Sequence, residues 1–147
     1  GLIVRGNGRI RQARFEQYAE AGHALENVPM ALLINHGSAS GAEIVAGALK
    51  DHGRARLFGQ RSYGKGSVQS VVPLGTGNAL KLTTAHYVTP AGIAINGHGV
   101  DPDVALDGAD ARRRFRITGT RPVGDDRALE LALQSLGYET IALSQAE

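Results

Sequence analysis

Apolar and polar residues alternate in blocks that predict a strand, a helix and a second strand. The run VPMALLIN (28–35) is apolar without interruption and closes at Asn35, which is typical of a buried parallel strand. Apolar residues then recur at helical spacing, so we predict a helix from near Ser40 to near Asp51. RARLFG (54–59) has the composition of the next strand, and this order indicates a parallel α/β unit.

The flanking segments carry patterns of the β type. We predict a short strand over GLIV (1–4) and a turn over RGNG (5–8), whereas residues 9–22 fit either a helix or an exposed strand. After Ser67, β-branched or alternating runs dominate, and GTGN (75–78) is a good hairpin turn. These runs are VQSVVPL, ALKLTTAHYVTP and GIAINGHG.

Helical spacing returns near the C-terminus. We predict a helix over about 126–136, ended by Gly137. Its apolar stripe consists of Ala128, Leu129, Leu131, Ala132, Leu133 and Leu136.

Composition narrows the classes of function. The 147 residues suit one domain with a core, and 42% hydrophobic with 20% charged residues is typical of a folded chain. A net charge of +2 argues against nucleic acid as a partner, and we interpret the basic cluster at 112–116 as a solvated face. The lack of cysteine excludes disulfides and thiol chemistry. No apolar run approaches the ~18 residues of a membrane helix, so this segment is not expected to insert into a membrane.

The stretch GQRSYGKGS (59–67) nearly spells a phosphate-binding loop. Such a loop requires a serine or threonine directly after its lysine and then a helix, whose first amides cradle the phosphates. Here Gly66 follows Lys65, and the β-branched run after it favours a strand. We therefore disfavour nucleotide binding. From this stretch alone, Lys65 is either a solvent-facing lysine in a glycine turn or a residue kept for other chemistry.

Ser40 stands where the first predicted strand leads into the predicted helix. A serine there is commonly a helix N-cap, and the same position also exposes a nucleophile beside the helix-start amides. In the second case the Gly41 N–H is a donor for a developing oxyanion. The residues alone leave both readings open.

A serine nucleophile needs a base, and the chain offers histidine or lysine. His36 lies on the same loop as Ser40, but no histidine has an acidic partner at an informative spacing, and no histidine pattern predicts a metal site. A lysine has a reference pKa of about 10.4, so a lysine base near neutrality needs surroundings that favour the neutral amine, such as burial. Apolar neighbours of Lys65 suggest such a site; they are Tyr63, Val68, Val71 and Val72.

These motifs resemble those of the carboxy-terminal processing proteases, also called tail-specific proteases, from Gly1 to about Val104. The resemblance is carried by GSAS, which contains Ser40, by YGKG, which contains Lys65, and by the 25-residue step between the two. It implies an α/β fold with a partial ββα spiral core of the Clp-protease and crotonase type, to which the pattern at about 126–136 adds a C-terminal helix.

The resemblance also implies an activity. It implies a serine endopeptidase that cleaves protein substrates near their C-termini through an acyl-enzyme, without a cofactor or metal. Ser40 is the implied nucleophile, Lys65 the general base, Gln69 the residue that orients the lysine and the Gly41 N–H an oxyanion donor. If a strand begins at Lys65, Gln69 shares its face, because residues i and i+4 of a strand point the same way.

Several expectations concern the protein around this site. We expect residues 1–107 to be the C-terminal part of a protease catalytic domain and 108–147 to be an extension. The family's PDZ-like domain and a second oxyanion donor would precede Gly1, so we expect a fragment that is weak or inactive alone. Gly41 and Ala42 replace the more usual Ala and Ser, with little harm expected. The resemblance implies a location in the bacterial envelope or periplasm.

Two other classes stay open. A non-catalytic peptide-binding or assembly piece would present an open sheet edge and form a homodimer. An acyl-thioester enzyme on the same spiral fold is the third reading, although it would not need Ser40 and Lys65 together.

Overall fold

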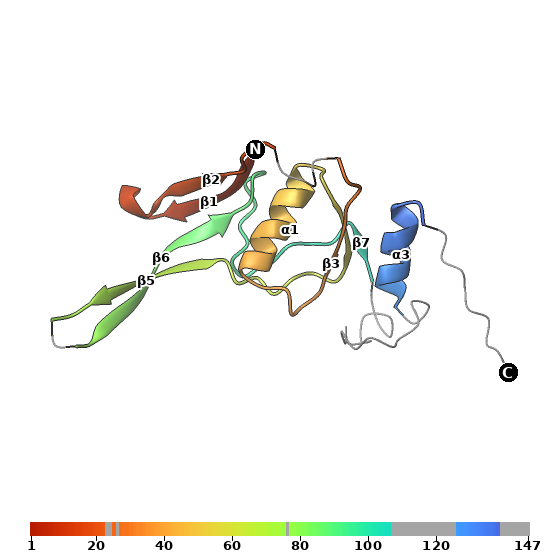
Figure 1. Cartoon of the computed structure of the whole chain (residues 1–147). Helices are drawn as coiled ribbons and strands as arrows, with labels where there is room; N and C mark the ends of the chain where they lie inside the picture. The colour runs from red at the N-terminus through yellow and green to blue at the C-terminus, as the bar shows by residue number, and fades with distance from the viewer. Residues whose placement is uncertain (23–24, 26, 76, 107–125, 139–147) are drawn as a thin grey trace.

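Two β-sheets lie on either side of a central helix in the computed structural model of the chain (Figure 1). The structure describes residues 1–22, 25, 27–75, 77–106 and 126–138. The central helix is α1 (Gly41–Asp51), which contacts the first strand of one sheet and the middle strand of the other. The fold is therefore mixed α/β, as the sequence predicts.

The larger sheet has four strands in the order β2-β1-β6-β5. Its strands are β1 (Leu2–Gly8), β2 (Phe15–Tyr18), β5 (Ser67–Pro73) and β6 (Ala79–Val88). All three pairings are antiparallel, and a short 3-10 helix, η1 (Arg11–Ala13), connects β1 to β2. β5 forms one edge, so one side of the strand that follows Lys65 is unpaired within this sheet.

The smaller sheet is parallel, in the order β3-β4-β7, with β3 (Ala31–Ile34), β4 (Arg56–Gly59) and β7 (Val104–Ala105). The predicted strand, helix and strand at β3, α1 and β4 are confirmed, and β3 pairs with β4 so that Ile34 lies opposite Gly59. Leu57, which is fully buried, anchors a core cluster under α1; the other members are Ile34, Ala46 and Val100, with Leu32 packed against them.

The C-terminal helix is also confirmed, as α3 (Arg127–Ser135). The Asp126 side chain caps it by accepting the Leu129 N–H, and Gly137 follows it with a φ of +85°. α3 packs against β3 and β4, so its apolar stripe covers the parallel sheet. The basic cluster at 112–116 lies outside the described residues.

Two local predictions are wrong. The turn expected over residues 5–8 is part of β1, because the ring of Phe15 lies so close that a Cβ at Gly6 would be 2.1 Å from it. The alternating run at 92–99 forms turns, with one isolated bridge from Val88 to Ala94. The ambiguous stretch at 9–22 contains η1 and the strand β2.

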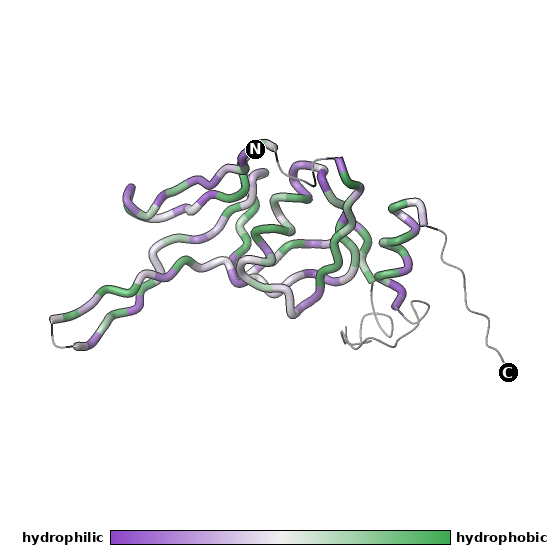
Figure 2. The backbone as a smooth tube through the Cα atoms, in the orientation of Figure 1, coloured by the Kyte–Doolittle hydropathy of each residue, from purple (hydrophilic) through white to green (hydrophobic). Residues whose placement is uncertain are grey.

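The β5–β6 hairpin projects from the body of the molecule (Figure 1). Hydrophobic residues recur along it (Figure 2), and several of their side chains are exposed. The connection between its strands spans the predicted turn at 75–78, of which residue 76 lies outside the described residues, and the Leu74 N–H donates to the Asn78 carbonyl. The exposed side chains are Val71, Val72, Leu74, Leu80 and Leu82. Within the described part of the chain, no helix has the length and apolar character needed to cross a membrane.

Candidate active site

Ser40 occupies a strained turn between β3 and α1. Its φ is +57° and its ψ is −115°, and no other non-glycine residue among those described has a positive φ. This backbone conformation costs a residue with a Cβ of order 1–3 kcal/mol and clusters at functional sites. A sharp, strained strand-to-helix turn is also how hydrolase nucleophiles are presented, and here it forms without the G-x-S-x-G pattern.

The loop before Ser40 is held by its own polar groups. The Asn35 side chain accepts the Gly37 N–H at 2.8 Å, and the Asn35 N–H donates to the Ser38 hydroxyl at 3.2 Å. The Ser38 hydroxyl therefore has a structural role within this loop. The Gly41 N–H finds no acceptor among the described residues, and Gly41 is exposed. A free amide next to Ser40 suits the expected oxyanion donor.

The lysine loop, residues 60–66, runs beside the serine loop, residues 35–40. The Tyr63 N–H donates to the Ser38 carbonyl at 2.9 Å, which joins the two loops directly. A Cβ at Gly66 would be 2.4 Å from the Asn96 nitrogen, and Gly64 has a φ of +91°. The two glycines around Lys65 are therefore required by close backbone packing, not by a phosphate.

Glu43 connects the loops through its side chain. It is fully buried, and its carboxylate accepts four hydrogen bonds, from the Ser40, Gly64 and Lys65 N–H groups and from the Ser62 hydroxyl. Sequence reasoning missed this residue. Its signal was the S-x-x-E spacing from Ser40 to Glu43, which predicts a capping box but not contacts with the lysine loop.

Ion pairs with Asp101 connect the lysine loop to the segment that follows residue 97. Arg61 donates to Asp101 at 2.5 Å, and His98 lies 3.3 Å from the same carboxyl. The hydrogen bond from Arg61 holds the pKa of Asp101 below its ordinary value, and the charges of Arg61 and His98 add to it. Lys50 of α1 donates to the Asp101 carbonyl and pairs with Asp103 at 3.2 Å, which ties this segment to the helix.

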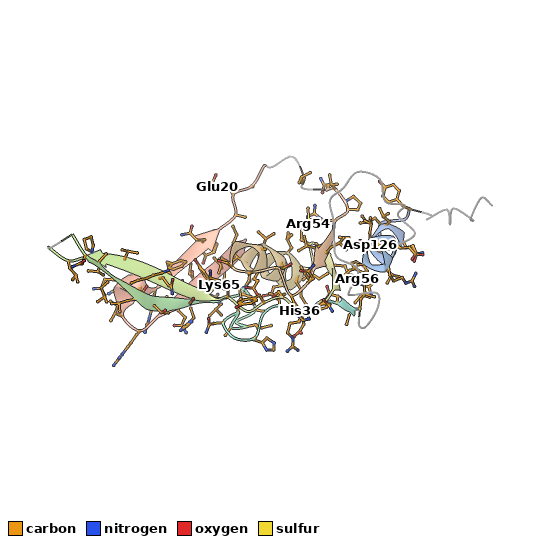
Figure 3. All side chains as sticks on the ribbon, turned by 90° about the horizontal axis from the view of Figure 1, so that it is seen from below. Glu20, His36, Arg54, Arg56, Lys65 and Asp126 are labelled. Atoms are coloured by element: carbon orange, nitrogen blue, oxygen red, sulfur yellow. The ribbon has the colours of Figure 1, made fainter. Side chains whose placement is uncertain are left out.

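Lys65 is exposed at the start of the β5–β6 hairpin (Figure 3). The burial suggested by its apolar neighbours is not found among the described residues, since Tyr63 is 69% and Val71 is 62% exposed. The structure brings the Ser40 and Lys65 backbones together, but it records no hydrogen bond between their side chains among the described residues. His36 is exposed on the serine loop and likewise has no recorded bond to Ser40.

The strand predicted over VQSVVPL is confirmed as β5, but the condition for Lys65 and Gln69 to share a face, a strand that begins at Lys65, is not met. β5 begins only at Ser67, and its pairing with β6 shifts register between Val68 and Gln69. Alternation across such a bulge is broken, so the shared-face argument fails. Gln69 itself is exposed on β5. Its role beside Lys65 stays a prediction.

The described residues contain no group of three or more histidine, aspartate or glutamate side chains that could hold a metal ion. The polar groups of the site are a hydroxyl, an amine, a backbone amide and a buried carboxylate. This set suits nucleophilic acyl transfer.

Comparisons with known proteins agree with this chemistry. The family model described as Peptidase family S41 matches residues 1–106. A carboxy-terminal-processing protease of Bartonella bacilliformis is 49% identical over 73% of this chain and 25% of its own length. A chloroplastic C-terminal processing peptidase of Tetradesmus obliquus is 46% identical over 61% of this chain and 20% of its own.

Solved structures give the same result. A photosystem II D1 C-terminal processing protease superposes with a TM-score of 0.65 at 42% identity, over 73% of this chain and 28% of that chain. An S41 protease from Bacteroides fragilis NCTC 9343 shares the fold, with a TM-score of 0.65 at 14% identity over 92% of this chain and 36% of that chain. The chain thus spans about a quarter of the curated relatives it matches.

The fold, the turn at Ser40 and the relatives together define the class of protein, the S41 peptidases. The family model covers well over half of the chain, and the chain belongs to peptidase family S41.

Proposed function

We propose that the protein is a serine endopeptidase that cleaves protein substrates near their C-termini, with Ser40 as the nucleophile and Lys65 as the general base. The observation that carries the proposal is the positive φ of Ser40 at the start of α1. A serine keeps such a strained conformation only where surrounding contacts impose it, and a nucleophile gains from it because its hydroxyl is exposed beside free amides.

The proposed reaction is acyl transfer in two halves. The Ser40 Oγ attacks the scissile carbonyl carbon while its proton passes to the neutral Nζ of Lys65. The carbonyl oxygen becomes an oxyanion, for which the Gly41 N–H is a donor. Lys65 returns the proton to the leaving amine, so the peptide bond breaks and an acyl-enzyme remains. Water then attacks the acyl carbon and gives a proton to the same amine. That proton passes to the Ser40 Oγ as its bond to the acyl group breaks, which releases the acid product and restores Ser40.

This mechanism requires Lys65 to be uncharged when it acts, yet Lys65 is exposed in the described chain. We propose that bound substrate, or protein beyond these residues, covers the amine and brings it to Ser40. The relatives are about four to five times as long as the segments that they match. Gln69 is proposed to accept a hydrogen bond from the amine once it is covered, and thereby to orient it.

The preference for C-terminal tails rests on the names of the relatives, which are carboxy-terminal processing proteases. Those relatives include a bacterial and a chloroplastic protein. We propose the bacterial envelope or periplasm for this chain, by likeness to the bacterial family.

Three variants of the full-length enzyme test the proposed dyad of Ser40 and Lys65. Ser40→Ala should abolish cleavage of a peptide with a free C-terminus, and Lys65→Ala should lower kcat by about 10²–10⁴-fold, the usual range for a general base. His36→Ala, on the same loop, should stay within about threefold of the parent, because no proton transfer depends on it. Loss of activity in His36→Ala with retention in Lys65→Ala would show that the base is the histidine.

An assembly role is the second candidate, and one observation favours it. β5 is an edge strand whose exposed side chains include Val71 and Val72, so a second chain would find both a free backbone edge and apolar surface. A serine-directed fluorophosphonate separates the two: covalent labelling at Ser40 supports the enzyme. No label together with a concentration-dependent homodimer in sedimentation supports assembly.

A further inference from the structure

The four hydrogen bonds to Glu43 divide between its two oxygens in an informative way. Oε1 accepts the Ser62 hydroxyl at 2.5 Å and the Gly64 N–H at 2.6 Å. Oε2 accepts the Ser40 N–H and the Lys65 N–H, each at 2.8 Å. One oxygen atom therefore bridges the backbone of the serine to the backbone of the lysine.

A carboxylate with no exposed surface is costly unless donors surround it. Glu43 meets this condition because each oxygen accepts two donors, and no charged side chain is needed. Capping of α1 explains only the bond from Ser40. The other three bonds come from residues on the lysine loop, so capping alone does not account for them.

Glu43 is also tied to the core. The Ser62 hydroxyl that donates to it accepts the Val100 N–H at 2.7 Å, and both Ser62 and Val100 are buried. The path from Val100 through Ser62 to Glu43 gives the carboxylate a fixed position relative to the hydrophobic cluster under α1. Both loops thus take their place from one buried side chain.

We propose that Glu43 is the positioning residue of the active site, which sets the distance between the Ser40 and Lys65 backbones. The proposal rests on the function proposed above. Glu43 touches neither reacting atom, because its carboxylate binds the backbone N–H groups of both residues rather than the hydroxyl or the amine. Glu43 fixes the Ser40 and Lys65 backbones relative to each other. Only the Lys65 side chain then has to rotate to bring its amine to Ser40. A misplacement of about 1 Å in such a pair costs on the order of 10²-fold in rate.

Glu43→Gln in the full-length enzyme tests this role. Glutamine keeps the shape but replaces one acceptor oxygen with an NH₂ donor, so two of the four donors lose their acceptor. We expect kcat to fall about 10–100-fold, as for loss of hydrogen bonds to a charged group, with KM within about twofold. Labelling of Ser40 by the fluorophosphonate should slow in parallel. The matched control is Glu20→Gln, the same change at an exposed site away from Lys65 (Figure 3), which should match the parent.

Active-site titration separates positioning from folding. If Glu43→Gln lowers only the number of titratable sites and each remaining site turns over at the parent rate, Glu43 is merely structural and the proposal fails. If Glu43→Gln does not fold, Ser62→Ala takes its place. It removes one donor and the link to Val100, and kcat per titrated site should fall about 5–20-fold, less than the effect of a full misplacement of the two loops. A rate within twofold of the parent would overturn the proposal.

The two proposals fail differently. Full activity of Ser40→Ala or Lys65→Ala would remove the dyad itself. Inactive dyad variants together with an unaffected Glu43→Gln would retain the dyad and reject only the role of Glu43.

Discussion

At the scale of single residues, the backbone of Ser40 predicts a conflict between stability and function. Glycine adopts a positive φ without steric cost, whereas alanine has the same Cβ as serine. We therefore expect Ser40→Gly to be about 1–2 kcal/mol more stable than Ser40→Ala, although both lack the proposed nucleophilic hydroxyl. Urea unfolding of the two variants measures the difference. Equal midpoints would show that Ser40 carries no backbone strain.

The same residues show what sequence reasoning found in the site. The GSAS and YGKG motifs located Ser40 and Lys65, and the structure joins their loops. Glu43 was not found, because three of its four donors lie 19 to 22 residues further along the chain and no local pattern encodes such a contact. Exposure of Lys65 was not foreseen either, since apolar neighbours in sequence need not pack on the side chain they flank.

At the scale of elements, the segment after the turns at 92–99 is held to the lysine loop by the Arg61–Asp101 pair, and this predicts a pH effect. The folded pKa of Asp101 is lowered from 3.8, chiefly by the Arg61 hydrogen bond. The pair therefore contributes its full stability above pH 3.8, and the contribution is lost as the pH falls through the lower folded pKa. Its size should be about 0–1 kcal/mol, because both side chains are about half exposed.

Asp101→Asn provides the measurement. The difference in unfolding free energy between parent and variant should shrink as the pH falls from about 5 towards 2.5. Asp51→Asn is a suitable comparison, since Asp51 accepts a backbone N–H from Ala91 and forms no ion pair with any residue that the structure describes. A difference that grows in acid would contradict the assignment of the pKa to the ion pair.

Elements with a clear hydrophobic pattern along the chain were predicted well. Features that depend on contacts between segments distant in sequence were not. The apolar run of β3, the helical spacing of α1 and the leucines of α3 each bury one side, so their patterns are visible in the sequence. The glycines of β1 suggested a turn, but Gly6 lies against the ring of Phe15 and Gly8 against Ala13. The register shift in β5 depends on its pairing with β6, which the alternation along one strand does not reveal.

At the scale of the whole molecule, the site joins two sheets through loops rather than within one element. Ser40 follows the parallel sheet and Lys65 precedes the antiparallel one, with α1 between them. Any movement of one sheet against the other would separate the Ser40 and Lys65 backbones unless a group such as Glu43 opposed it. This arrangement explains why the carboxylate is buried at the junction, although it bonds mainly to backbone groups.

The proposed division of the chain after residue 107 yields a prediction about α3. α3 packs on β3 and β4, and Ala132 is only 4% exposed, so removal of residues 108–147 uncovers one face of the parallel sheet. At about 25 cal/mol per Å² of apolar surface, loss of several half-buried leucines should cost roughly 2–4 kcal/mol of unfolding free energy. Urea unfolding of the shortened and complete chains measures this difference in unfolding free energy.

Ala132→Asp, which places an unpaired charge at the same contact, should destabilise in the same direction, whereas Arg127→Gln on the exposed side should not. If the shortened chain and Ala132→Asp both unfold at the parent midpoint, α3 contributes nothing to the protease fold and residues 1–107 are stable without it.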